Sequence, residues 1–254
     1  MARTVFLRGR EEIEAIREAA SLVAQTLAML SREVRPGVTT ESLDRLAEAF
    51  ILERGGRPAF KGYRGFPASI CPSINDEVVH GIPGPRILSD GDIVGMDVGV
   101  EKDGYFGDAA CTFPVGTVGP EVERLLQVTR EALMRGVAQA RGGNRVGDIS
   151  HAIQSHVEAH GYSVVRSLVG HGIGRHMHEE PQVPNYGTPD RGPRLMAGQV
   201  LAIEPMVNVG APDAVTRPDG WTVVTKDVSL SAPFEHTAAV GVEGPEILSL
   251  PDGD

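Results

Sequence analysis

Two stretches of the chain place apolar residues at the spacing of an amphipathic helix. The first runs from Glu11 to Ser31 and the second from Glu121 to Ala140. This spacing brings the apolar side chains onto one side of a helix, so we predict a helix in each stretch. The apolar positions recur every three to five residues, at Ile13, Ile16, Ala20, Val23 and Leu27 in the first stretch and at Leu125, Val128, Leu133 and Val137 in the second.

The segment that follows each predicted helix resembles its counterpart in the other half of the chain. RPGVTTESLDRLAEAFILERGG, at 35–56, and RGGNRVGDISHAIQSHVEAHGY, at 141–162, lie 106 residues apart. Each segment indicates a second helix, ended by Gly55 or by Gly161, because glycine is common just after a helix. Further on, GDIVGMD aligns with GQVLAIE, so Asp97 and Glu204 come at corresponding ends of two predicted strands.

These similarities predict a single domain, 1–254, with two pseudo-symmetric halves at roughly 11–115 and 120–245. The expected fold class is α/β (α+β), with two helices and part of a curved antiparallel sheet in each half. Helices would cover one face of the sheet, and the other face would carry an acidic cleft. Segments 57–67 and 211–219 are rich in Gly and Pro or polar, which indicates loops at the rim. The alternative is chance similarity between two helix–turn–helix–strand runs.

Composition and charge narrow the possible functions. The 254 residues suit one large domain or two intimately packed halves. With 24 basic and 34 acidic residues, the net charge of −10 argues against a nucleic-acid-binding surface, which is usually basic. No apolar run suits a signal peptide or a transmembrane helix, which needs roughly 18 apolar residues. The two cysteines, Cys71 and Cys111, are typical of a reducing cytosol, and a single disulfide between them stays open.

Five potential metal ligands lie within or beside apolar segments of the sequence. Carboxylates in such segments are costly to bury unless a positive charge meets them. A shared cation, most plausibly a pair of divalent metals, would remove that cost. The alternative for Glu235 is that it lies at an exposed strand end and binds no metal. The five residues are Asp97, Asp108, His171, Glu204 and Glu235.

The first two of these carboxylates flank a predicted hairpin. Lys102-Asp103-Gly104 is a turn signal between them. A turn centred on Lys102 and Asp103 would place Asp97 directly opposite Asp108, with Cβ atoms about 5 Å apart. Metals in a two-metal site lie about 3.5–4 Å apart, a distance that such a pair could span. The alternative is that one of the two aspartates only caps a turn.

The histidine-rich motif GHGIGRHMHEEP supplies His171 between two glycines, which allow a close approach of backbone and metal. Pro181 and Pro184 argue against a helix here, and on a strand His176 and His178 would share one face. One imidazole with four carboxylates suits Mn, Fe or Co. The sequence contains no CxxC pair, GxSxG elbow, P-loop or GxGxxG after a strand, so structural zinc, serine chemistry and nucleotide binding lack local support.

Taken in order, the motifs of the chain closely resemble those of a bacterial type I methionine aminopeptidase. The matching segments cover nearly the whole chain, and the resemblance implies the pita-bread fold, whose halves are related by pseudo-symmetry. The segments are CPSINDEVVHGIP, GDIVGMDVGVEKDGYFGDAACTF, GHGIGRHMHEEPQVPNYG, GQVLAIEPMV, DGWTVVTKDVSLSAPFEHT and EILS.

The resemblance also implies a role for each site residue. Asp108 and Glu235 would bridge two divalent metals, Asp97 would bind one of them, and His171 with Glu204 the other. Mn, Fe or Co would be the expected metals, with Zn or Ni as alternatives. Catalysis would involve His80, His178 and Glu204, with Glu204 moving a proton, whereas His176 would be a bystander. The expected substrate-binding residues are His80, His178, Tyr63, Phe66, Cys71, Met177 and Trp221, with Phe60 also at the pocket.

The implied reaction is hydrolysis of the first peptide bond of a nascent polypeptide by a metal-activated hydroxide, which releases methionine when the second residue is small. We expect a cytoplasmic monomer in a minimal catalytic form, acting on N-termini at the ribosome, with no nucleic-acid or membrane partner. A proline-specific peptidase of the same fold is the nearest rival, but those enzymes usually carry an additional N-terminal domain. A non-catalytic binding protein would be expected to have lost ligands, and none is lost here.

Overall fold

The computed structural model describes residues 4–250 and contains the helices that the apolar spacing predicted. Helix α1 spans Arg10–Glu33 and α3 spans Pro120–Val137, within a few residues of the predicted bounds. The two similar segments contain α2, Thr40–Glu53, and α4, Val146–Ala159. As predicted, a glycine follows α2 and α4 in the left-handed conformation, with φ of 76° at Gly55 and 84° at Gly161. A short 3-10 helix, η1, covers Tyr63–Gly65.

The strands form four small sheets, and every pairing between named strands is antiparallel. The sheet orders are β1-β4-β2 with β5 also on β4, β13-β10-β6, β11-β12-β3 and β15-β14-β9-β7-β8. The strands are β1 Arg57–Pro58, β2 Ile70–Ile74, β3 Glu77–Val79, β4 Ile93–Lys102, β5 Tyr105–Pro114, β6 Ser163–Val164, β7 Val169–Gly172, β8 Glu179–Pro184, β9 Val200–Ile203, β10 Met206–Asn208, β11 Ala214–Thr216, β12 Val223–Thr225, β13 Ser231–Pro233, β14 His236–Ala239 and β15 Glu246–Ile247.

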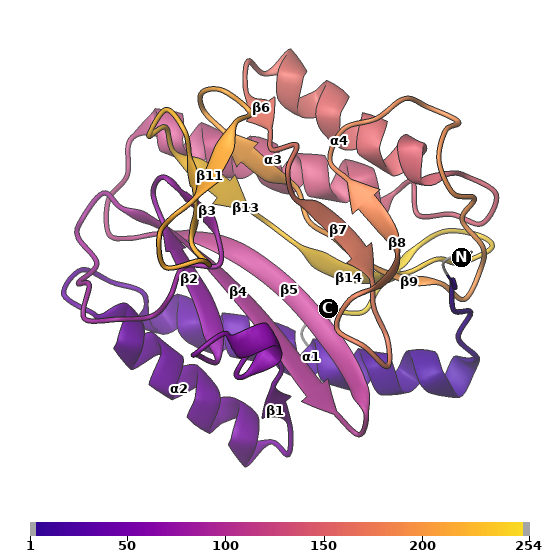
Figure 1. Cartoon of the computed structure of the whole chain (residues 1–254), viewed down its shortest axis with the longest axis horizontal. Helices are drawn as coiled ribbons and strands as arrows, with labels where there is room; N and C mark the ends of the chain where they lie inside the picture. Colours follow the sequence, from indigo (N-terminus) through magenta and orange to yellow (C-terminus); the bar gives the residue numbers. More distant parts are fainter. Residues whose placement is uncertain (1–3, 251–254) are drawn as a thin grey trace.

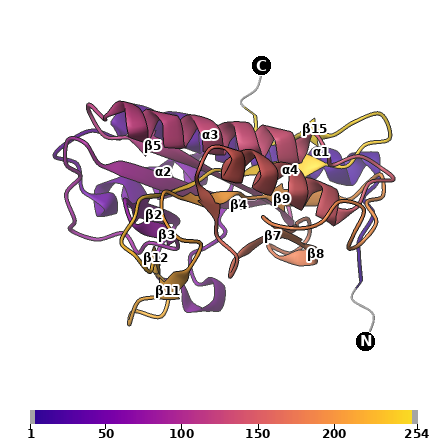
Figure 2. The same cartoon turned by 90° about the horizontal axis from the view of Figure 1, so that it is seen from above.

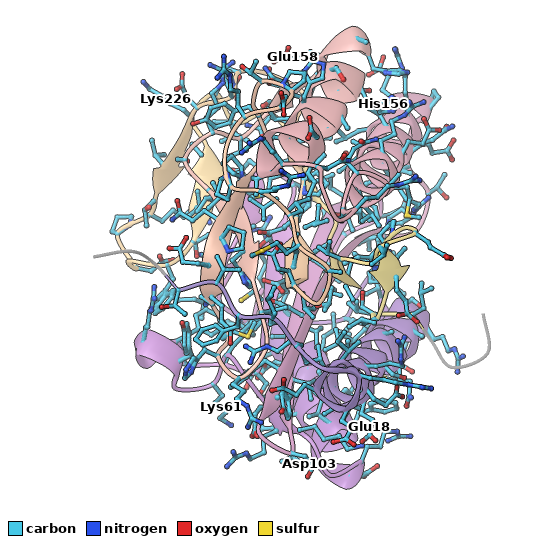
Figure 3. The ribbon with its side chains drawn as sticks, turned by 90° about the vertical axis from the view of Figure 1, so that its right-hand side faces the viewer. Glu18, Lys61, Asp103, His156, Glu158 and Lys226 are labelled. Carbon is cyan, nitrogen blue, oxygen red and sulfur yellow. The ribbon has the colours of Figure 1, made fainter. Side chains whose placement is uncertain are left out.

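The helices cover one side of the strands, as the sequence predicted. Figure 2 shows α1, α3 and α4 along one side, whereas β8 and β11 project from the other. In Figure 1, α1 and α2 lie with β4 and β5, while α3 and α4 lie at the opposite end of the molecule. Side chains labelled in Figure 3 follow this division, with Glu18, Lys61 and Asp103 at one end and His156, Glu158 and Lys226 at the other. Within residues 4–250, no helix is long and apolar enough to cross a membrane.

Two apolar cores lie beneath the two helix pairs. Residues of α1 and α2, such as Leu30 and Leu43, pack with β4 in one core. Residues of α3 and α4, such as Leu133 and Ile149, pack with β9 in the other. Cys111 is half-buried and contacts both cores, and neither cysteine forms a disulfide. The sulfur of Cys111 is therefore part of the packing where the cores meet.

Strand β5 joins the first part of the chain to the last. The amide of Glu235 donates a hydrogen bond to the carbonyl of Ala110 over 2.9 Å. The hydroxyl of Thr112 donates to the carbonyl of Pro233 over 2.6 Å. The two groups of strands are thus held together along β5. The division of the chain into pseudo-symmetric halves at roughly 11–115 and 120–245 stays a prediction.

Three details differ from the expectations. Segment 57–67 contains β1 and η1 as well as loop, and β11 lies within 211–219, where it pairs with β12. Asp97 lies in the middle of the ten-residue strand β4, whereas Glu204 directly follows β9, so the two residues do not occupy equivalent strand ends. Val98, Gly99 and Val100 continue the buried strand β4 beyond Asp97. The alignment of two short apolar runs could not reveal this continuation.

Candidate active site

All five predicted ligands line one cavity, of about 210 Å³. They come from separate segments that meet at the junction of the sheets. Asp97 lies on β4, Asp108 on β5 and His171 on β7, while Glu204 and Glu235 lie between strands. The other residues that line the cavity are Phe60, Cys71, Val79, His80, Ser167, Leu168, Val169 and His178.

The β4–β5 hairpin places its two aspartates on one face, but not directly opposite each other. Lys102 pairs with Tyr105, so the turn residues are Asp103 and Gly104, one position later than predicted. Both have positive φ, 52° and 80°, as the favoured two-residue hairpin turn requires. Asp97 therefore pairs with Ala110, and Asp108 with Gly99. The predicted direct pairing of the two aspartates is wrong. They are diagonal neighbours on one face of the sheet, and their Cβ atoms are expected to lie at most about 7–8 Å apart.

The cavity concentrates carboxyl groups that are hard to ionise. Burial raises the pKa of Asp97 to about 7. Burial also raises the pKa of Asp108 well above its usual range, and the charges of Asp97 and Glu204 act in the same direction. The pKa values of Glu204 and Glu235 rise for the same reasons, burial first and neighbouring carboxylates second. A cation in the cavity would reverse this electrostatic cost, because each carboxylate would then face a positive charge.

The donor atoms fit a divalent metal. Asp108, His171 and Glu235 each offer a ligand atom within 4.8 Å of the other two. Nδ1 of His171 lies 2.9 Å from the carbonyl of Gly172, to which it can donate, leaving the lone pair of Nε2 to face Asp108 at 3.7 Å. Burial lowers the pKa of His171 to about 4, which favours the neutral, metal-binding imidazole. Among the described residues, Oδ1 of Asp97 and Oδ1 of Asp108 are buried without a hydrogen-bond partner.

His178 lies beside the predicted ligands, on the loop between β7 and β8. The loop forms bends rather than the predicted strand. The imidazole of His178 lies 4.2 Å from that of His171, between ring centroids. His176 and His178 are both exposed, and Met177 between them is buried. This alternation agrees with the predicted shared face of the two histidines, although no strand is present.

Tyr63 contacts His178 from the other side. Its hydroxyl oxygen lies 2.9 Å from Nδ1 of His178, and the two rings are stacked. Although His178 is partly open to solvent, desolvation by the surrounding protein lowers the pKa of its imidazole, and the nearby His171 and Arg64 act in the same direction, which favours the neutral form at pH 7. A tyrosine hydroxyl that donates to Nδ1 keeps the proton of the neutral imidazole on Nε2.

We expect Tyr63→Phe to lower kcat on a short substrate peptide about fivefold to tenfold, because one hydrogen bond is worth about 1 kcal/mol. The ring and its stacking would be retained, so the melting temperature should change little. Steady-state kinetics and thermal unfolding of both proteins test this. An unchanged kcat would show that the hydroxyl does not control the imidazole.

An apolar cluster lies next to the cavity and contains the other predicted substrate-binding residues. Cys71 is buried and pairs across the strands with Asp97. The rings of Phe66 and Trp221 meet edge to face at 5.2 Å, and His80 approaches Trp221 at 6.3 Å. His80 follows β3 with a φ of 59°, an uncommon conformation for this residue type. The cluster includes Phe60, Phe66, Cys71 and Met177, with Tyr63 and Trp221 half-buried against it.

The sequence did not identify several residues that support the site. Thr237 binds the backbone of Asp108 through its hydroxyl, and the Asn185 amide donates to the carbonyl of Glu204 over 2.7 Å. Both residues are completely buried. Thr237 is the last residue of the FEHT motif, and this position was the only feature of the sequence that could have marked it. Ser167 and Leu168 line the cavity without any local pattern that marks them.

Comparison with known proteins assigns the chain to a family. The model of metallopeptidase family M24 matches residues 14–241. A methionine aminopeptidase from Clostridium perfringens is 53% identical over 97% of this chain and 99% of its own length. A methionine aminopeptidase 1 from Bacillus subtilis is 51% identical over 96% of this chain and 99% of its own length.

Solved structures agree on the fold. The crystal structure of methionine aminopeptidase from Rickettsia prowazekii matches with a TM-score of 0.96 and 45% identity, over 97% of this chain and all of that one. The prolidase from Pyrococcus horikoshii matches with a TM-score of 0.77 over 97% of this chain and 64% of that one, but at 20% identity this likeness concerns the fold alone. The predicted pita-bread fold is confirmed, and the chain belongs to metallopeptidase family M24, among its type I methionine aminopeptidases.

Proposed function

We propose that the chain hydrolyses the peptide bond that follows an N-terminal methionine, in a metal-dependent reaction, when the second residue is small. The observation that carries this proposal is the position of five predicted metal ligands beside the apolar cluster of Phe66, Cys71 and Trp221. The apolar cluster would receive the methionine side chain, while the ligands lie where the peptide bond would be cut. The preference for a small second residue is what the resemblance to type I methionine aminopeptidases implies.

Two divalent metals would be held by this chain's own carboxylates and one imidazole. Asp97, Asp108, His171, Glu204 and Glu235 would hold them. Mn, Fe or Co suits this oxygen-rich set, with Zn or Ni as alternatives. When bound, the metals supply Lewis acidity that polarises the substrate carbonyl and lowers the pKa of water.

The surrounding side chains would move the protons and orient the substrate. A carboxylate oxygen of Glu204 would accept the proton of the attacking water and deliver it to the leaving amine. Nε2 of His178 would donate a hydrogen bond to the oxygen of the scissile carbonyl, where negative charge develops. His80, which lines the same cavity beside Trp221, would contact the scissile amide. Met177 and Tyr63 would complete the pocket for the methionine side chain.

The substrates in this proposal are the N-termini of nascent polypeptides. They become available as chains leave the ribosome, so we place the reaction in the cytoplasm, with the protein acting as a monomer. A single domain that combines both halves would then contain the complete catalytic machinery.

Three peptides with the metal-loaded protein test the proposed function. We expect release of methionine from Met-Ala-Ser and none from the matched peptide Met-Lys-Ser or from an Ala-Pro peptide, measured by chromatography of the free amino acids. Cleavage of the Ala-Pro peptide alone would indicate a proline-specific enzyme. If no peptide is cleaved with any of Mn, Fe, Co, Zn or Ni, a binding function would be favoured instead.

A further inference from the structure

A buried ion pair joins the segment before α1 to the loop that carries His178. Nη2 of Arg8 donates to both carboxylate oxygens of Glu179, at 2.6 and 2.5 Å. Only 6% of the Arg8 side chain and 4% of the Glu179 side chain are exposed. The two residues are 171 positions apart in the sequence. Removing one partner of a pair this well buried would leave an uncompensated charge, which is strongly unfavourable.

The Glu179 carboxylate shapes the loop that contains His178. Its Oε1 accepts hydrogen bonds from the backbone amides of Arg175, at 2.9 Å, and His176, at 3.1 Å. On the other side of the loop, the amide of Phe106 donates to the carbonyl of Gly174 over 2.8 Å. Residues 174–176 of the loop are therefore held by two different segments, and His178 directly precedes the glutamate that holds them.

The N-terminal segment that supplies Arg8 is itself fixed to the C-terminal half. The backbone amide of Arg8 donates to the carbonyl of Gly198 over 2.7 Å, and Val5 forms a parallel bridge with Glu180. In Figure 1, the indigo segment before α1 runs from that helix toward β8 and β9. Arg8 thus reaches the His178 loop from a backbone position that other contacts determine.

Glu12 of α1 lies near two arginines, Arg8 and Arg175 of the loop. Its Oε1 accepts a hydrogen bond from the hydroxyl of Tyr105 at 3.1 Å and lies 3.5 Å from Nε of Arg175 and 3.7 Å from Nη1 of Arg8. Arg175 in turn donates to the hydroxyl of Tyr105. Arg175 of the loop is therefore bound to Glu12 on α1 and to Tyr105 on β5.

We propose that Arg8 is a positioning residue for His178: its ion pair with Glu179 sets the loop geometry that presents the imidazole to the scissile carbonyl. The inference rests on the proposed function through the role of His178 alone. Arg8 lies outside the cavity, so its effect on the reaction would pass through Glu179 and the loop backbone.

Arg8→Met retains the aliphatic stem and leaves the Glu179 carboxylate without its partner. We expect kcat for Met-Ala-Ser to fall about tenfold, with a smaller change in KM, because the side chain does not touch the substrate. In a His178→Ala background, the same substitution should cause almost no further loss. Equal losses of kcat in both backgrounds would mean that Arg8 only stabilises the fold, and would overturn the proposal.

Gly174→Ala tests the same ion pair without removing a charge, should Arg8→Met fold poorly. A Cβ atom at this position would lie 2.5 Å from Nη2 and 2.8 Å from Cζ of Arg8, so the guanidinium would have to move. We expect a similar loss of kcat, with metal content unchanged. Arg45→Met, which breaks an exposed ion pair with Glu41 on α2, is the matched control and should leave kcat unchanged. Unaltered kcat in Gly174→Ala and Arg8→Met would overturn the proposal.

The imidazole resonances of His178 provide a readout that does not depend on turnover. Assigned by comparison with His178→Ala, they should shift in Arg8→Met and remain in place in Arg45→Met. Unshifted resonances in Arg8→Met would refute the positioning role. If the wild-type protein released no methionine from Met-Ala-Ser, the proposed function would fail, and this spectral comparison would still decide whether Arg8 positions the loop.

Discussion

Asp108→Asn should lower kcat/KM for Met-Ala-Ser by at least about a thousandfold, which corresponds to about 4 kcal/mol of transition-state stabilisation. The Asp108 carboxylate lies at the centre of the predicted ligand set, close enough to His171 and Glu235 to share a cation with them. Asparagine retains the shape but removes the charge that two metals would share. Isothermal titration with Mn²⁺ should accordingly show a large loss of affinity.

The same substitution should stabilise the protein when a chelator is present. Burial, together with the charges of Asp97 and Glu204, raises the pKa of Asp108 above its unfolded value. A raised carboxyl pKa means that the ionised form destabilises the fold at neutral pH, and that this cost disappears as the pH falls. A neutral asparagine should therefore increase the free energy of unfolding at pH 7 by about 1 kcal/mol, measured by urea denaturation with EDTA.

Asp103→Asn is the matched control for both measurements. Asp103 lies at the turn of the same hairpin, at one end of the molecule (Figure 3), and asparagine tolerates its positive φ. The control should leave activity and metal affinity unchanged. Full activity in Asp108→Asn would remove this carboxylate from the metal site and contradict the proposed ligand set.

The features that the sequence predicted well depend on local patterns. The helices α1 and α3 follow from apolar residues spaced along one face, and Gly55 and Gly161 mark the ends of α2 and α4 by their own backbone preference. The candidate ligands could be identified because a carboxylate within an apolar strand is unfavourable wherever that strand packs. None of these inferences required knowledge of which strands are neighbours.

The features that the sequence did not predict depend on small geometric choices or distant contacts. Moving the hairpin turn by one residue was enough to make Asp97 and Asp108 diagonal rather than opposite. The His178 loop is bent by its bonds to Glu179, whose partner Arg8 is 171 residues away in the sequence. The sequence therefore predicted a strand in that segment, because it could not reveal such a contact.

Thr237 connects Asp108, one of the predicted metal ligands, to the packing between the strands of the two halves. Its hydroxyl accepts a hydrogen bond from the amide of Asp108 at 3.1 Å and donates one to the carbonyl of Asp108 at 2.7 Å. The residue is fully buried on β14, and its own amide donates to the hydroxyl of Ser249. The backbone that carries Asp108 on β5 is therefore bound by a single side chain from β14.

Thr237→Val should lower the free energy of unfolding by about 3 kcal/mol, because valine has nearly the same shape but leaves two buried backbone groups of Asp108 without partners. Urea denaturation measures this loss, and titration with Mn²⁺ should show weaker binding, since the Asp108 backbone is no longer held. Thr216→Val, at an exposed position on β11, is the matched control and should change neither quantity. Equal stability of the Thr237 and Thr216 variants would mean that other contacts alone hold β5 against β14.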